Sequence, residues 1–166
     1  MLNEEAIKTQ LVDWIKDFVE KSNPLLNNWA PCPYARQARI ADKIEIVFVD
    51  DPVHIICTVE NSLYLLDNKD VVIVCFDHTT VSSDTISDIV SAHNQVLMKK
   101  DYVVLEDHPD ANEILNGVTM NFGKCGLLLV QRLSKLSTAS DQLREKGYYN
   151  NWPEENYQDV VAWRYQ

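Results

Sequence analysis

Glycine is scarce in this sequence: four glycines occur among 166 residues, and none precedes Gly117. The chain therefore contains neither the G-x-G-x-x-G loop of dinucleotide-binding folds nor the G-x-x-x-x-G-K-[ST] loop that holds nucleotide phosphates. Long apolar runs are missing as well, because none approaches the roughly 18 residues that a membrane-spanning helix requires. These absences exclude Rossmann-type and P-loop nucleotide binding and predict a protein without a transmembrane segment.

Basic residues are also in short supply. The chain has 15 Lys and Arg residues against 25 Asp and Glu residues, which gives a formal net charge of -10. Such a charge repels nucleic-acid phosphates and anionic lipid at long range, so we expect no nucleic-acid partner and no membrane partner. The first five residues lack the basic region of a secretory signal, and a cytoplasmic location is expected.

Length and composition are those of a globular protein. One domain usually takes about 100 to 200 residues, and the 46% hydrophobic and 24% charged residues lie near the average for soluble proteins. We expect a single α/β domain over residues 1–166, with an aromatic-rich C-terminal extension at 148–166.

Apolar spacing and turn signals predict an alternation of helices and strands. In chain order we expect a helix over 4–21, a short helix over 32–41, a strand over 43–49, a helix over 51–66, a strand over 70–76, a helix from 82 or 83 to 97, a strand over 102–105, a strand over 126–133, a helix over 137–146 and a short helix from 153. Strands joined through helices are usually parallel. The predicted fold is α/β, with a mainly parallel sheet of about four strands and flanking helices. An α+β, ferredoxin-like fold is the alternative, and the path of residues 107–125 stays open.

Residues that carry chemistry follow the ends of two predicted strands. Asp77 and His78 follow one strand, and Asp107, His108 and Asp110 follow the next. In parallel sheets, ligands bind beyond the carboxyl ends of the strands, which share one edge. We therefore expect these side chains to meet at that edge.

Cys32 is the cysteine best placed for reactivity. The cysteines have no C-x-x-C spacing, and three of them lie in apolar runs and are expected to be small buried hydrophobes: Cys57, Cys75 and Cys125. Cys32 instead begins a predicted short helix that returns it to the edge of His78 and His108. The helix dipole, Arg36 and Arg39 are expected to lower the thiol pKa. The alternative is that Cys32 only caps a proline-rich turn.

The run Cys32-Pro33-Tyr34-Ala35-Arg36, the strand ending at His78 and the run Asp107-His108-Pro109-Asp110 together resemble an uncharacterised bacterial domain family of unknown function. Its members carry Cys-Pro-Phe-Ala-Lys near the N-terminus, a histidine closing a central strand and a later Phe-His-Pro-Asp segment. The similarity covers roughly residues 10–112. The resemblance implies Cys32, His78, His108 and Asp110 as site residues, and it implies no reaction.

These residues predict a small thiol-dependent enzyme. Cys32 would be the nucleophile or redox-active thiol, and His78 or His108 the general base. The acids that could orient this base are Asp77, Asp107 and Asp110, and the candidate substrate-binding residues are Arg36, Asp77 and Asp107. A zinc-binding or iron-binding version of the site stays open, although the spacing fits no recognised metal motif. The alternative is a non-enzymatic binding or assembly module with an aromatic C-terminal interface. A small-molecule ligand and a homodimer are also left open, and the cofactor is unknown.

Overall fold

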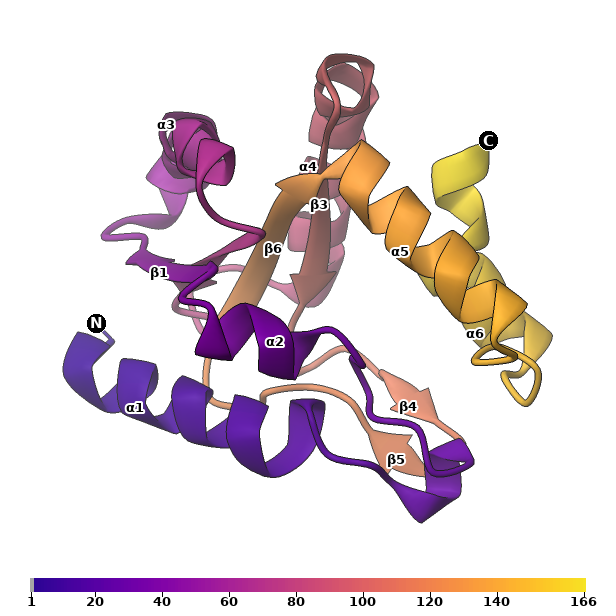
Figure 1. The fold of residues 1–166 in the computed structure, drawn as a ribbon. Helices are drawn as coiled ribbons and strands as arrows, with labels where there is room; N and C mark the ends of the chain where they lie inside the picture. The colour runs from indigo at the N-terminus through magenta and orange to yellow at the C-terminus, as the bar shows by residue number, and fades with distance from the viewer. Residues whose placement is uncertain (1) are drawn as a thin grey trace.

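The computed structural model describes residues 2–166, which form layers of helices around a β-sheet (Figure 1). In chain order the elements, with η marking a short 3-10 or π-helical segment, are α1 (Glu4–Trp14), η1 (Ile15–Val19), η2 (Pro24–Leu26), α2 (Ala35–Ile40), β1 (Ile44–Phe48), η3 (Pro52–His54), α3 (Ile55–Ser62), η4 (Leu63–Asp67), β2 (Val71–Phe76), α4 (Ser83–Leu97), η5 (Met98–Lys100), β3 (Tyr102–Asp107), β4 (Ile114–Leu115), β5 (Val118–Thr119), β6 (Gly126–Arg132), α5 (Leu133–Glu145), α6 (Glu154–Val160) and η6 (Ala162–Tyr165). Helix α5 continues from β6 and extends away from the sheet, with α6 beside it (Figure 1). Within residues 2–166 no helix has the length and apolar character needed to cross a membrane.

The main sheet is mixed, which corrects the expectation of a mainly parallel sheet. Its strand order is β1-β2-β6-β3; β1 and β2 are parallel, whereas β6 runs antiparallel to both β2 and β3. The predicted strand positions are confirmed, but only the small β4–β5 hairpin separates β3 from β6. Parallel neighbours are usually joined through a crossover helix; the connection over residues 108–125 contains none, and β6 returns antiparallel. Strands β1, β2 and β3 still point the same way, and their carboxyl ends share one edge.

The central strand β2 is buried on both faces of the sheet. Its alternate residues Val72, Val74 and Phe76 pack toward α3 and α4, while Ile73 and Cys75 pack toward α1. Successive side chains of a strand point to opposite faces, and here both faces are covered by helices. This explains why the strand is an unbroken apolar run in the sequence.

Gly126, the first residue of β6, is required by close packing. It lies opposite Phe76 in the β2–β6 ladder, and a Cβ atom at this position would clash with the Phe76 ring. The aromatic ring therefore takes the place that a side chain of residue 126 would occupy, and it belongs to the core on the α3 and α4 face.

The helix starts expected at residue 82 or 83 and at Cys32 have different outcomes in the structure. Ser82 caps α4, and its side chain accepts a backbone N–H from the first turn. Helix α2 begins at Ala35 with Tyr34 at its N-cap position, so the prediction that Cys32 caps this helix is wrong. The Cys32 N–H donates to the Val19 carbonyl at 2.9 Å, and the Cys32 carbonyl accepts the Ala35 N–H at 3.2 Å. These bonds hold Cys32 in the turn that precedes the helix.

The aromatic C-terminal extension packs against the rest of the chain. Tyr148, Val161 and Arg164 are buried. The Tyr148 hydroxyl donates to the Pro31 carbonyl at 2.7 Å, which joins the extension to the segment before α2. The association of two copies into a homodimer stays a prediction.

Candidate ligand-binding cleft

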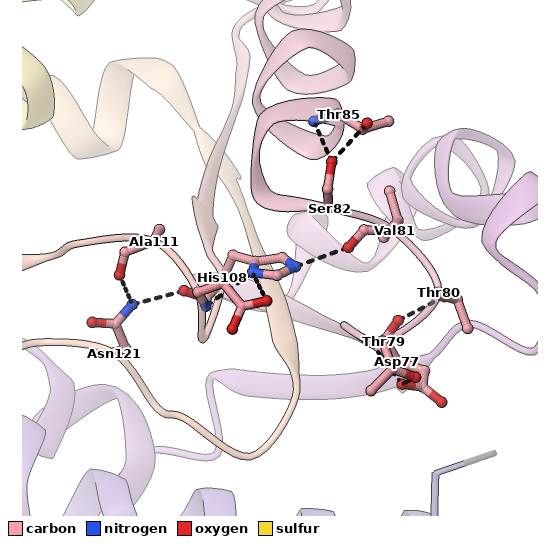
Figure 2. Close-up of polar contacts among 10 residues, drawn as sticks. Asp77, Thr79, Thr80, Val81, Ser82, Thr85, His108, Ala111 and Asn121 are labelled. Atoms are coloured by element: carbon pink, nitrogen blue, oxygen red, sulfur yellow. Dashed lines mark hydrogen bonds and ion pairs between the residues drawn. The ribbon is translucent and has the colours of Figure 1, made fainter.

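The two histidines predicted at the sheet edge do lie together. The ring centroids of His78 and His108 are 5.8 Å apart, with the ring planes nearly perpendicular. His108 Nε2 is 2.9 Å from the Val81 carbonyl oxygen (Figure 2), and His108 Nδ1 accepts the Asp110 N–H at 3.1 Å. Because Nδ1 acts as an acceptor, the ring proton lies on Nε2. His108 therefore links the loop after β3 to the loop after β2 through Nε2, while its Nδ1 makes a hydrogen bond within its own loop.

The acids beside these histidines have local partners. Asp77 accepts the backbone N–H and the hydroxyl of Thr79 at 3.0 and 2.7 Å, and the pKa of Asp77 is lowered by these bonds, the hydroxyl's first. Asp110 is exposed, with Oδ2 4.0 Å from His108 Nδ1. The Asn121 side chain donates to the His108 carbonyl at 2.8 Å (Figure 2). The loops after β2 and β3 at this edge of the sheet are thus held by a network of hydrogen bonds.

Cys32 does not have the lowered thiol pKa that the sequence predicted. The residue is exposed, yet protein atoms crowd its surroundings, and the resulting desolvation raises the thiol pKa despite the opposing effect of the Tyr34 and Ala35 N–H groups. Arg39 instead forms a bidentate ion pair with Glu20, in which Nε and Nη2 donate to the two carboxylate oxygens at 2.8 and 2.6 Å. The expected lowering is therefore wrong, because the dipole of a six-residue helix that begins at Ala35 does not offset the desolvation.

Cys32 and the histidines are not joined by direct polar contacts. Across residues 2–166, no hydrogen bond or ion pair links Cys32 to His78 or to His108. Arg36 is exposed on α2. The thiol-dependent enzyme built from these residues stays a prediction.

A cleft of about 1380 Å³ lies elsewhere, between α4, β3 and the C-terminal extension. Strand β3 is the last strand of the sheet, so one of its edges has no neighbouring strand. Asn94 of α4 covers part of this edge, since its side chain donates to the Val104 carbonyl and accepts the Val104 N–H, both at 2.9 Å. The cleft is lined by three of the four tryptophans of the chain: Trp14, Trp152 and Trp163. Its volume exceeds the roughly 300 to 1,000 Å³ of small-molecule sites, so such a ligand would fill part of it.

Four acids line this cleft: Asp159 belongs to α6, and the other three, Glu106, Asp107 and Glu113, belong to β3 and the loop that follows it. Consecutive residues of a strand point to opposite faces, and both Glu106 and Asp107 line the cleft because it wraps around the free edge of β3. Asp107 is only 6% exposed. Its Oδ2 accepts the Phe122 N–H at 2.9 Å, whereas its buried Oδ1 accepts no hydrogen bond from residues 2–166.

The surroundings of these carboxyls favour their protonated forms. Desolvation is the main cause of the raised pKa of Asp107, and the same cause raises the pKa of Glu106. Burial, followed by repulsion from Asp107 and Glu106, raises the pKa of Glu113 to about 8. Within the part of the chain that the structure describes, none of the three forms an ion pair with a lysine or arginine. These three carboxyls therefore lack a basic partner within the described residues, although Lys99 and Arg164 also line the cleft.

Sequence reasoning identified Asp107 but missed Glu106 and Glu113. Glu113 lies in the stretch 107–125, whose path could not be predicted. The density of acids from Glu106 to Glu113 is visible in the sequence and was the available signal. Another missed residue is Arg164, which lines the same cleft and is buried; nothing in its local sequence indicates burial.

No known protein family, no curated protein and no solved structure matches the chain. Among residues 2–166 no three His, Cys, Asp or Glu side chains are grouped so that they could hold a metal ion. The function is therefore argued from the geometry and charge of the cleft.

Proposed function

We propose that the protein binds a small organic cation, with an ammonium or guanidinium group, in the acidic cleft. The observation that carries this proposal is the gathering of Glu106, Asp107 and Glu113 without a basic partner. Perturbed ionisable groups in a cleft are typical of functional sites. Buried carboxylates cost free energy unless they are paired, and a bound cation would provide the missing partner.

The shape and composition of the cleft favour an organic cation. An ammonium or guanidinium group donates several hydrogen bonds, and Asp107 Oδ1 is an acceptor without a partner among residues 2–166. Tryptophan is the best cation–π partner among the aromatic residues. Trp14 lines the cleft, and its ring centroid is 5.3 Å from that of Phe122, whose N–H binds Asp107. Aromatic surface and carboxyl groups thus line the same cleft.

Pentylammonium is a suitable probe, and pentanol is its neutral match. We expect calorimetry at pH 8.5, where Glu113 is mostly ionised, to show binding of pentylammonium and much weaker binding of pentanol. Glu113→Gln should weaken pentylammonium binding about tenfold, as expected for loss of one charge-assisted hydrogen bond. Glu155→Gln is the matched control, because Glu155 is exposed and lies outside the cleft lining.

Two results would contradict the proposal. Equal affinities for pentylammonium and pentanol would mean that the cleft holds the apolar chain and does not recognise the charge. Equal weakening by Glu113→Gln and Glu155→Gln would mean that the attraction comes from the overall charge of -10 and not from the cleft.

A further inference from the structure

We infer that Arg164 forms a carboxylate-binding subsite in the same cleft, so that the ligand is a zwitterion with both an ammonium and a carboxylate group. This inference rests on the proposed function, because it adds a second recognition point to the cation site. It concerns the wall of the cleft formed by the C-terminal extension, which also carries Asp159, whereas Glu106, Asp107 and Glu113 belong to β3 and the loop that follows it.

The Arg164 guanidinium is buried without an anionic partner. The residue is 6% exposed. Its Nη2 donates to Ser140 Oγ at 3.0 Å, and its Nε donates to the Val160 carbonyl at 3.3 Å. Its Nη1 is buried and has no hydrogen-bond partner in residues 2–166, and no carboxylate of this part of the chain forms an ion pair with it.

A buried arginine in this state is unusual, because buried charges are normally paired. The guanidinium carbon of Arg164 lies 6.0 Å from the centroid of the Tyr165 ring, which is the outer limit of a cation–π contact. Desolvation lowers the pKa of Arg164, which agrees with a cation held away from water. An anion from a ligand would supply both the countercharge and an acceptor for Nη1.

A carboxylate fits this subsite better than a phosphate does. Four acidic residues line the cleft, and the whole chain carries a formal charge of -10. A free dianion would be repelled by this field. A carboxylate on a molecule that also carries an ammonium group has no net charge, so its approach is not opposed, and its two ends match the two kinds of charge that line the cleft.

The test uses matched probes on the full chain. ε-Aminocaproate carries both charges, pentylammonium lacks the carboxylate, and hexanoate lacks the ammonium; glycine and γ-aminobutyrate hold the two charges closer together. We expect at least one of the zwitterions to bind about tenfold more tightly than the corresponding amine. Arg164→Gln should remove this advantage, so that the zwitterion binds no more tightly than pentylammonium. Arg132→Gln, which removes a charge paired with Asp67 outside the cleft lining, should retain it.

A second measurement needs no variant, since Arg164→Gln could loosen the C-terminal extension. In the wild-type protein, the ¹⁵Nε resonance of Arg164 should shift with the bound zwitterion and stay in place with pentylammonium. Pentylammonium binding without any advantage for a zwitterion, or without the shift, would overturn the subsite and leave the cation site standing. Hexanoate binding that depends on Arg164 while pentylammonium fails to bind would retain the anion subsite and overturn the cation site. Failure of all probes to bind would overturn both.

Discussion

Replacement of Glu113 by glutamine should stabilise the protein in a pH-dependent way. The Glu113 pKa rises from an ordinary value of 4.5 to about 8 in the folded state. Between these two values the folded protein holds a proton that the unfolded chain has released, so stability is lost as pH rises from 4.5 to about 8. One pKa unit corresponds to about 1.36 kcal/mol, so about 3 kcal/mol of stability is lost through Glu113 between pH 4.5 and pH 7. Glutamine keeps the shape of the side chain and does not ionise.

The assay is urea unfolding followed by tryptophan fluorescence at several pH values. The free energy of unfolding of Glu113→Gln minus that of the wild type should grow by about 3 kcal/mol from pH 5 to pH 8 and level off above pH 8. Glu155→Gln, at an exposed position of α6, controls for the general effect of removing one negative charge. If the difference in the free energy of unfolding between Glu113→Gln and the wild type does not change with pH, the raised pKa of Glu113 is refuted.

Further predictions concern Asn94 beside the cleft, the packing at Gly126 and the reactivity of the cysteine thiols. Asn94→Ala should lower the free energy of unfolding by about 2 to 4 kcal/mol, because it removes two hydrogen bonds to the edge of β3 and leaves buried backbone groups unpaired; an unchanged urea midpoint would contradict this role. Gly126→Ala should cost about 1 to 3 kcal/mol or more, because its Cβ clashes with Phe76, and a wild-type melting temperature would contradict the packing. Cys57 is exposed and not buried as its apolar neighbours predicted, so iodoacetamide at pH 8 should modify it no more slowly than Cys32, whose pKa is raised, while the two buried cysteines react only after unfolding. Mass mapping that finds Cys32 far more reactive would restore the prediction made from its sequence context.

The strands were predictable because their signals are local. The apolar run of β2 and the alternation of β1 appear in any short window of the sequence. The direction of β6 was not predictable, because pairing depends on the connection that precedes it, and residues 107–125 carry only weak signals. The mixed sheet results from that connection.

The candidate site was likewise predictable only where local signals determine it. The meeting of His78 and His108 follows from two strands that end at one edge, which strand positions alone indicate. The state of Cys32 depends on crowding by distant parts of the chain, and the burial of Arg164 depends on docking of η6 against Ser140 of α5. The raised pKa of Glu113 likewise needs Asp107 and Glu106 close to it in space, which sequence separation does not reveal.

The most direct test of the cation site is an NMR titration of the Glu113 side-chain carboxyl carbon with and without pentylammonium. Without the probe, the carboxyl should titrate with a pKa of about 8. A bound cation favours the ionised carboxylate, so saturating pentylammonium should move this pKa well below 8, and binding near pH 7 should release a proton. A Glu113 carboxyl that titrates near its ordinary value of 4.5, or a pKa that the probe leaves unchanged, would contradict the account.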